Sequence, residues 1–340
     1  YGSHIGSTQL LVDVDDNRIC TLEANENLTA PKFTSDQAAA RDAYILAGGD
    51  RAIEINGIVT AALANARVLG AEVVAEATAD ISRGQRTDGS FDNRAVESPM
   101  SNMVAQMFYD KLGAGNPEFI GVQNPGGTRA NFDTGEIAYA EAAAVLPFAN
   151  TLMTTQLTGA QVKTMLEQQW QPEGASRPYL ALGLSDNVSY TYDPTRPAGD
   201  RIIDIFINGN PIDLAKLYTV GSGSFLIGGG DNFTVIGEGV NRTDTGRADL
   251  EAWVEWLFEQ ATVSPDFTLR GVVFAGPTDL TVGTPVTWTI GQPLVAGDTT
   301  TPMNPSLDML AIGAPANAVL TAHLGSATGT QVGTVNIVDG

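Results

Sequence analysis

The sequence predicts a mixed α/β fold, with helices around a mixed sheet in the centre of the chain and a smaller all-β, sandwich-like region after it. Between residues 67 and 275, two kinds of segment alternate along the chain. In one kind, polar and apolar residues alternate as in strands; in the other, apolar residues recur every three or four positions, as in amphipathic helices. After Gly276 and Pro277 the chain changes to short alternating runs rich in threonine, valine and glycine. A chain of 340 residues that is 43% hydrophobic is long enough for two or more globular domains.

Two short sections precede the central one. Residues 1–28 alternate in polarity on either side of a turn at 15–17, which predicts a β-hairpin, a structure that is not stable alone in water. Residues 29–66 are rich in alanine and are interrupted by Gly48 and Gly49, so we expect a helical linker. Because the chain begins without methionine and in mid-strand, we expect residues 1–28 to be the remnant of a preceding domain.

Helix and turn signals occur throughout the central section. Ser98 and Pro99 are typical of a helix start, because serine caps the first turn and proline fits its first position. Thr158 and Gln161 form a capping box that predicts a second helix, and Asn-Gly at 208–209 predicts a tight turn after a strand. A third helix is expected near residues 247–261. The residues expected on the buried faces of the three helices are Met103, Val104, Met107 and Phe108; Val162, Met165 and Leu166; and Leu250, Trp253, Val254 and Leu257.

The charge of the chain limits its partners. The formal net charge of −21, from 18 basic and 39 acidic residues, argues against a general nucleic-acid binder, which needs a basic surface. A small anion is still a possible ligand where arginines cluster, and Arg83, Arg86, Arg94 and Arg129 lie in one stretch. For Arg83 and Arg86 we favour solvated surface positions. No run of about 18 or more apolar residues occurs, so we predict no membrane span.

Three short motifs together predict a nucleotide pocket. The first, Asn124–Arg129, has two glycines that let the backbone approach a ligand and an arginine that can hold a phosphate with two parallel hydrogen bonds. The second, Pro147–Asn150, and the third, Phe225–Asp231, each combine an aromatic ring with an amide or a carboxylate, as needed to stack a base and to bind a sugar.

These motifs and their surroundings resemble the C-terminal, substrate-specificity domain of the 5'-nucleotidase family, which includes periplasmic UDP-sugar hydrolases and animal ecto-5'-nucleotidases. Order and spacing agree over the central section, residues 67–275, and residues 1–28 resemble the closing hairpin of the metallophosphoesterase domain that precedes it in that family. The matching segments are Arg94–Asn102, Asn124–Arg129, Val145–Asn150, Leu157–Gly159, Gly199–Arg201, Tyr218–Val220, Phe225 and Gly229–Asp231.

The resemblance implies a role for each site residue. Phe148 and Phe225 would sandwich the base, and Asp231 would accept hydrogen bonds from the ribose. Asn150 would touch the base, and the phosphate end would be held by Asn124, Arg129 and Arg94. Other interpretations stay open: a simple turn at Gly126 and Gly127, ordinary packing for Phe148, and a cap of the next helix for Glu97.

Bond cleavage in this family depends on two divalent metal ions, such as Zn²⁺ or Mn²⁺, held by Asp, His and Asn ligands. This chain has two histidines, His4 and His323, in different sections and without the spacing of metal ligands, so we predict no metal or cofactor site in it. Gly221–Ser224 lacks the spacing of a serine nucleophile, so we predict no catalytic residue. The resemblance implies a phosphoric ester hydrolase as the parent protein, with this chain alone inactive.

Two functions follow as expectations. The first is the substrate-binding portion of a secreted, periplasmic or cell-surface 5'-nucleotidase that binds a nucleotide or nucleoside. The alternative is a catalytically silent structural module of an extracellular surface assembly. In that case residues 276–340, which are few for a complete sandwich, would contact neighbours or a second copy of the chain.

Overall fold

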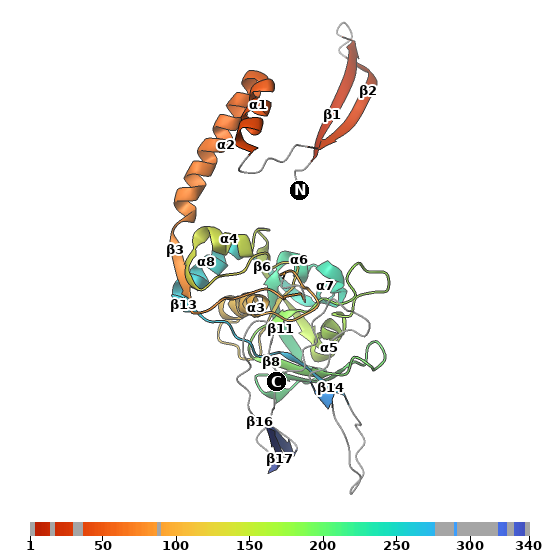
Figure 1. Cartoon of the computed structure of the whole chain (residues 1–340). Helices are drawn as coiled ribbons and strands as arrows, with labels where there is room; N and C mark the ends of the chain where they lie inside the picture. The colour runs from red at the N-terminus through yellow and green to blue at the C-terminus, as the bar shows by residue number, and fades with distance from the viewer. Residues whose placement is uncertain are drawn as a thin grey trace. The chain divides into compact units, whose positions relative to one another are not determined.

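A computed structural model describes residues 4–13, 18–29, 37–86, 90–275, 289–290, 319–324 and 330–336 of the chain (Figure 1). The chain divides into two compact units, residues 1–67 and 68–340. Each unit is described by itself. The division into a hairpin remnant, a linker, a central domain and a β-rich end stays a prediction.

The first unit contains the expected hairpin and helices. Strands β1 (His4–Asp13) and β2 (Arg18–Thr29) are antiparallel, with His4 opposite Thr29. The predicted turn at 15–17 lies outside the described residues. Helices α1 (Ala38–Ala47) and α2 (Gly49–Gly70) meet at the predicted glycine pair, where Gly49 has a φ of +71°, a conformation that glycine adopts without strain. The prediction of a helical segment interrupted at this pair is confirmed.

Helix α2 bears on the expectation of no membrane span without deciding it. By length and composition alone it could cross a membrane, and none of its most apolar stretch is buried. Glu54 and Arg67 interrupt its apolar run, so the expectation stays a prediction. One such helix is weak evidence for a membrane span, since core helices of soluble proteins pass the same test.

The second unit is built on a mixed five-stranded sheet. Its strand order is β12-β6-β11-β4-β7, in which β11 and β4 are parallel and the other neighbours are antiparallel. The strands are β4 (Ile120–Gln123), β6 (Thr151–Thr158), β7 (Gly183–Leu184), β11 (Leu217–Gly223) and β12 (Val240–Ala248). The prediction of a mixed α/β fold is confirmed.

Two further sheets of this unit have five and three strands. One has the order β10-β9-β8-β14-β15 and the other the order β13-β3-β5. Their strands are β8 (Val188–Tyr192), β9 (Ile202–Ile207), β10 (Asn210–Pro211), β14 (Gly271–Ala275) and β15 (Thr289–Ile290), and β3 (Val73–Ala77), β5 (Gly135–Ala138) and β13 (Thr262–Val263). Strands β9 and β10 are joined by the predicted Asn-Gly turn, whose residues have φ values of +50° and +73°.

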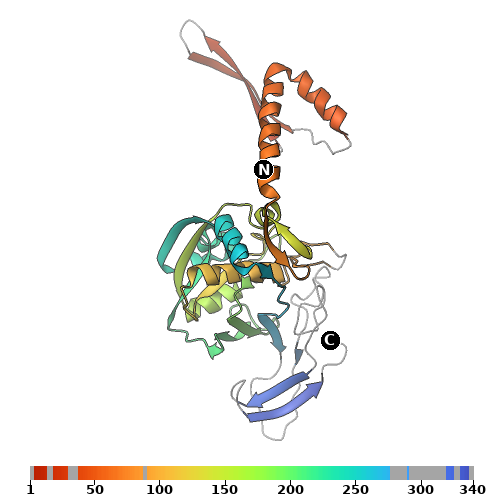
Figure 2. The ribbon, with the colours of Figure 1, turned by 90° about the vertical axis from the view of Figure 1, so that its left-hand side faces the viewer.

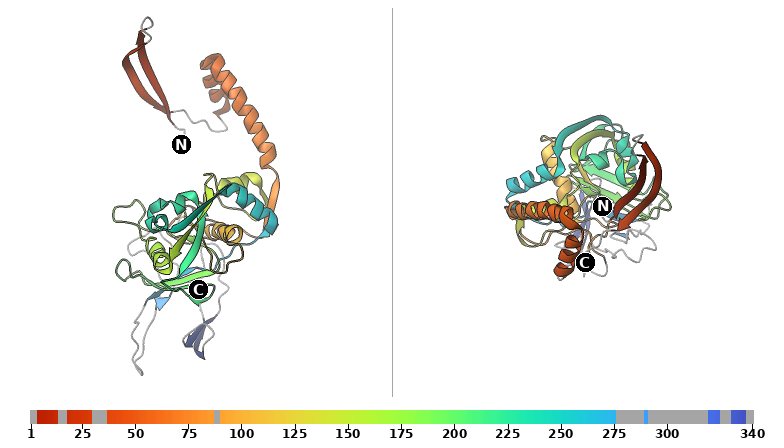
Figure 3. Two further views of the ribbon diagram at one scale, coloured as in Figure 1. Left: turned by 180° about the vertical axis from the view of Figure 1, so that it is seen from behind. Right: turned by 90° about the horizontal axis from the view of Figure 1, so that it is seen from above.

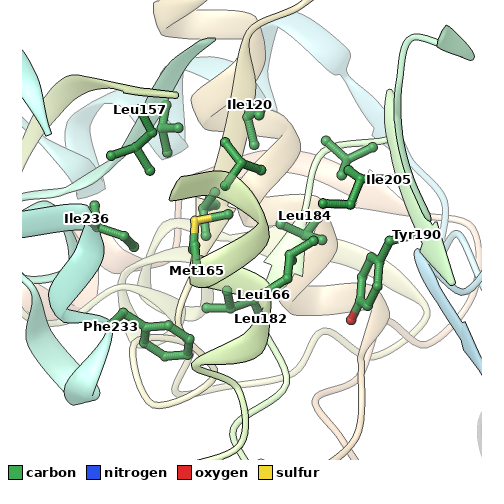
Figure 4. Close-up of a cluster of buried hydrophobic side chains, with 14 of the residues drawn as sticks. Ile120, Leu157, Met165, Leu166, Leu182, Leu184, Tyr190, Ile205, Phe233 and Ile236 are labelled. Atoms are coloured by element: carbon green, nitrogen blue, oxygen red, sulfur yellow. The ribbon is translucent and has the colours of Figure 1, made fainter. Parts of the chain in front are cut away.

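Hydrophobic cores cover both faces of the central sheet. On one face lie α3 (Pro99–Leu112) and α8 (Asp249–Gln260) (Figure 2). These helices bury Met107, Phe108, Trp253 and Leu257. Helix α8 also contacts α4 (Tyr139–Val145) and β3 (Figure 3). The other face carries α5 (Gly159–Glu167), α6 (Ser224–Ile227) and α7 (Thr234–Gly237). Met165 and Leu166 of α5 pack there between residues of the central sheet and those of β8 and β9 (Figure 4).

The helix starts follow the signals in the sequence. Ser98 caps α3 by accepting a hydrogen bond from the backbone N–H of Ser101, and Pro99 is the first helical residue. Thr158 and Gln161 form the predicted capping box of α5. The expected faces of the three helices are buried, except that Leu250 is only partly buried.

The predicted sandwich after residue 275 is largely outside the described residues. Within the described part, β15 pairs with β14 and so extends the second sheet. Strands β16 (Val319–Leu324) and β17 (Thr330–Asn336) pair with each other. The sandwich stays a prediction.

Candidate functional site

The first and third motifs meet through two side chains. The Nδ2 group of Asn124, at the end of β4, donates a hydrogen bond of 2.7 Å to Oδ2 of Asp231. Asp231 lies in a short 3₁₀ turn, η2 (Gly230–Asn232), and has a φ of +52°. The left-handed region is uncommon for residues other than glycine, but aspartate and asparagine adopt it more readily than most. The turn therefore holds the carboxylate against the first motif.

Gly126 lies between an arginine and this carboxylate. A β-carbon at Gly126 would stand 2.7 Å from Nη1 of Arg94 and 3.3 Å from Oδ2 of Asp231. A β-carbon at Gly127 would stand 2.7 Å from Oδ1 of Asn124. Both glycines are therefore in crowded positions next to site side chains, and they do more than form a turn.

The second motif approaches the first through Arg129. Its backbone N–H donates to the carbonyl of Val145 (2.9 Å), and Nη1 donates to the carbonyl of Gly126 (3.5 Å). Its guanidinium carbon lies 5.9 Å from the centre of the Phe148 ring, within the range of a cation–π contact. Phe148 is 54% exposed, so it is not a core residue and much of its ring is free to contact a ligand.

Asn150 links the second motif to the third. Its Oδ1 accepts hydrogen bonds from the backbone N–H of Phe225 (3.3 Å) and the hydroxyl of Ser224 (3.4 Å). Its Nδ2 donates to Oδ2 of Asp249 (3.0 Å), whose pKa is raised, chiefly by burial. Asn150 therefore positions Phe225, which is 51% exposed.

Arg94 also contacts a carboxylate that the motifs do not include. Its Nε donates to Oδ1 of Asp92 (3.0 Å), which lies 3.8 Å from Nη1 of Arg83. Burial opposes the ionisation of Asp92, but Arg94 and Arg83 keep its pKa below the usual value. The side chain of Arg83 is only 20% exposed, so the prediction of a solvated surface position for Arg83 is wrong.

Glu97 has a structural role. It is partly buried, and it accepts hydrogen bonds from Nδ2 of Asn102 (2.9 Å) and from the backbone N–H groups of Arg270 (2.6 Å) and Gly271 (3.2 Å). Burial raises the pKa of its carboxyl. Glu97 ties the start of α3 to β14, whereas the cap of α3 is Ser98.

Within the described residues, no three side chains of His, Cys, Asp and Glu gather as a metal site. His4 lies in β1 and His323 in β16. The sequence did not single out Asp92 or its further neighbour Arg177, nor did it single out Asp249, Arg270 and Gly271. In the sequence, these residues are marked only by their type and by the presence of a motif nearby. Their contacts with one another and with the motifs depend on the tertiary fold.

Comparison with known proteins shows which protein family the residues of this site resemble. Residues 73–238 match the family model of the 5'-nucleotidase C-terminal domain. The trifunctional nucleotide phosphoesterase protein YfkN of Bacillus subtilis is 31% identical over 172 residues, which cover 48% of this chain and 11% of that protein. The 5'-nucleotidase of Rattus norvegicus is 28% identical over 156 residues, which cover 42% of this chain and 27% of that protein. This chain therefore spans well under half the length of these relatives.

Two solved structures share the fold. The 5'-nucleotidase precursor of Thermus thermophilus matches with a TM-score of 0.54 and 27% identity, over 80% of this chain and 50% of that chain. The NAD nucleotidase of Haemophilus influenzae matches with a TM-score of 0.51 and 19% identity, over 80% of this chain and 53% of that chain. At that identity the second match supports the fold alone.

Proposed function

Because residues 73–238 form a 5'-nucleotidase C-terminal domain, we propose that this chain binds nucleotides as the substrate-binding portion of a metal-dependent 5'-nucleotidase-type phosphohydrolase. The observation that carries the proposal is the cluster of Asn124, Asp231 and Arg94 around Gly126, close to an exposed phenylalanine. Polar groups of opposite charge beside an uncovered aromatic ring match the chemistry of a nucleoside phosphate.

The base would stack on Phe148 and Phe225. Both rings are about half exposed, so part of each ring is accessible to a ligand. Stacking of a base on an aromatic side chain contributes about 1 to 3 kcal/mol and tolerates every base. Asn150 would contact the base from its position beside Phe225.

The sugar and the phosphate would contact the polar cluster. Asp231 has one carboxylate oxygen on Asn124, and its other oxygen would accept hydrogen bonds from the ribose hydroxyls. Arg94 and Arg129 would hold the phosphate, because a guanidinium offers two parallel N–H groups to phosphate oxygens. Gly126 and Gly127, which lack a β-carbon, let Arg94, Asp231 and Asn124 lie close to the backbone of the first motif.

We propose that the two divalent cations of the reaction, Zn²⁺, Mn²⁺ or similar, are bound by other residues of the active protein. We propose that the described residues bind the substrate and that they do not cleave its phosphate ester. We also propose a secreted, periplasmic or cell-surface location, which agrees with the strongly acidic composition and with relatives that include a precursor.

Calorimetry with adenosine and AMP, in the presence of a chelator, tests the binding. We expect both ligands to bind and Phe148→Ala and Phe225→Ala each to weaken adenosine binding by roughly tenfold. Phe258→Ala removes a similarly exposed ring from α8 and serves as the control. A folded chain that binds neither ligand would contradict the proposal and favour a structural module.

Hydrolysis tests the second part. AMP is incubated with the chain and Mn²⁺ or Zn²⁺, and phosphate release is measured. We expect none above the level without protein. Release that depends on the chain and on the metal would show that the chain itself holds the cleaving residues.

A further inference from the structure

Three segments of the chain meet at one edge of the central sheet. Strand β6 lies between β11 and β12 and is antiparallel to both, and the last residue of each neighbour pairs within the first two residues of β6. Asn150 precedes β6, Phe225 lies in the helix that follows β11, and Asp249 follows β12. The topology therefore brings Asn150 and Asp249 together, although 99 positions separate them in the sequence.

Helix α6, which carries Phe225, has no cap of its own. Gly223 is at its N-cap position and has no side chain that could accept the free backbone N–H groups of the first turn. Oδ1 of Asn150 takes this place, since it accepts from the backbone N–H of Phe225 (3.3 Å) and from the hydroxyl of Ser224 (3.4 Å). Both distances are long for hydrogen bonds, so these two bonds alone hold the amide of Asn150 weakly.

Asp249 supplies a stronger bond to the same amide. It is 2% exposed, and its Oδ2 accepts a hydrogen bond of 3.0 Å from Nδ2 of Asn150. A bond to a charged acceptor is roughly twice as strong as one between neutral groups. Asp249 is itself fixed, because its Oδ1 accepts the backbone N–H of Leu250 (2.8 Å) and its backbone N–H donates to the carbonyl of Asn150 (2.8 Å).

The carboxylate of Asp249 also decides which way the amide of Asn150 points. A carboxylate only accepts hydrogen bonds, so the NH₂ group of the amide faces Asp249 and the amide oxygen faces the backbone N–H of Phe225. If the amide turned over, its oxygen would face a carboxylate and its NH₂ group would face another donor. Asp249 therefore excludes the orientation of Asn150 that leaves α6 without a cap.

We propose that Asp249 is a positioning residue of the base-binding part of the site, which acts through Asn150 to hold Phe225 in the orientation that stacks on a base. The inference rests on the proposed function, since a base must bind at Phe225. A ring that is already oriented does not lose its freedom when the ligand binds, so the affinity is higher. Because Asp249 is almost fully buried, it acts on the ligand only through its neighbours.

The test compares AMP with ribose 5-phosphate, which lacks the base. Calorimetry is done with the whole chain and a chelator, and ribose 5-phosphate is measured by its competition with AMP. Asp249→Asn keeps the size of the side chain but leaves one acceptor oxygen for two donors, Leu250 and Asn150. We expect it to weaken AMP binding roughly fivefold to tenfold and to change ribose 5-phosphate binding less than about twofold.

Glu251→Gln is the matched control. Glu251 is the other acidic residue in the first turn of α8, so this variant also removes a negative charge from the helix start. We expect it to leave the binding of both ligands unchanged. Thermal unfolding of every variant separates an effect on the stability of α8 from an effect on binding.

Exchanging the two side chains tests the contact itself. Asn150→Asp places two carboxylates together and should weaken AMP binding. Adding Asp249→Asn to it restores one amide and one carboxylate with their places exchanged, so the backbone N–H of Phe225 again faces an acceptor. We expect the double variant to bind AMP at least roughly threefold more tightly than Asn150→Asp. Both proteins in this comparison have the same side chain at position 150, and it remains valid if Asp249→Asn alone does not fold.

The failure of this inference and that of the proposed function are distinguishable. If the unaltered chain binds neither adenosine nor AMP, the proposed function fails and the inference with it. If AMP binds, but Asp249→Asn leaves its affinity unchanged or weakens AMP and ribose 5-phosphate equally, Asp249 does not position the base site and the nucleotide site stands. A double variant that binds AMP no better than Asn150→Asp would lead to the same conclusion.

Discussion

The side-chain amide of Asn124 and the carboxylate of Asp231 are 2.7 Å apart, although 107 residues separate them in the sequence. Asn124 is nearly fully buried at the end of a central strand, so it gives the carboxylate a fixed partner. The bond leaves the other oxygen of Asp231 without a side-chain partner among the described residues. This arrangement presents an oriented acceptor to a ligand.

Asp231→Asn tests this acceptor. Asparagine has the same size and adopts the left-handed conformation of Asp231, so the fold should be retained. Because a hydrogen bond to a charged acceptor is lost, we expect adenosine to bind roughly tenfold more weakly by calorimetry. Binding of 2',3'-dideoxyadenosine should be equal in both proteins, and Asp186→Asn serves as the control. An equal loss for the dideoxy ligand would show that Asp231 does not contact the ribose.

Gly126→Ala tests the space in the site. The added methyl group would stand 2.7 Å from Nη1 of Arg94 and 3.3 Å from Oδ2 of Asp231, so Arg94 must move. We expect AMP affinity to fall by more than roughly tenfold, with little change in the thermal midpoint, because Arg94 is a flexible side chain. Unchanged AMP binding would contradict the placement of the ligand over Gly126.

The matched control is Gly57→Ala in α2. A β-carbon there meets nothing within 4 Å, and glycine inside a helix is unfavourable. We expect AMP binding to be unchanged and α2 to be stabilised by about 0.5 to 1 kcal/mol. Far-ultraviolet circular dichroism during thermal unfolding checks the second point.

Thr158→Ala tests the capping box of α5. Thr158 accepts the backbone N–H of Gln161 at 3.2 Å, and alanine cannot do so. We expect the free energy of unfolding, measured in urea, to fall by about 1 kcal/mol. Thr164→Ala, in the middle of the same helix, removes only a bond to the carbonyl of Ala160 and should cost less, because alanine favours helices. A larger loss for Thr164→Ala would contradict the capping argument.

Local signals predicted much of the fold. Neighbouring residues determine both the start of α3 at Ser98 and Pro99 and the turn at 208–209. Both features can therefore be predicted from the sequence. The mixed α/β class followed from the same periodicities. The edge pairing of β15 with β14 was not predicted, because it joins segments on both sides of the change in composition at Gly276.

The residues of the candidate site also fall into those that local sequence signals predicted and those that only the folded chain brings together. Apart from Arg94, which the family resemblance indicated, the site residues named in advance lie in motifs whose glycines and aromatics are themselves the signal. Asp92 and Arg177 have no such motif, and their relation is an ion pair between residues 85 positions apart that exists only in the folded chain. Arg83 was expected in solvent because arginine usually is, whereas Asn131 and Asp92 hold it in a partly buried position.

The last prediction concerns buried tyrosines. Tyr179, Tyr190 and Tyr192 are nearly fully buried in the second unit, and burial raises the pKa of each phenol. In the unfolded chain these phenols ionise near pH 10, but in the folded chain they stay protonated above it. Their contribution to stability is therefore complete below about pH 10 and is lost as the pH rises, by about 1.4 kcal/mol per pH unit for each phenol.

We therefore expect phenolate absorbance to rise in two steps in an alkaline titration, with the second step coinciding with the loss of the circular dichroism signal. Tyr192→Phe should make the second step smaller by one phenol and make the pH dependence of stability less steep. If Tyr192→Phe reduced the first step instead, Tyr192 would be accessible to solvent in the folded chain, against the burial described here.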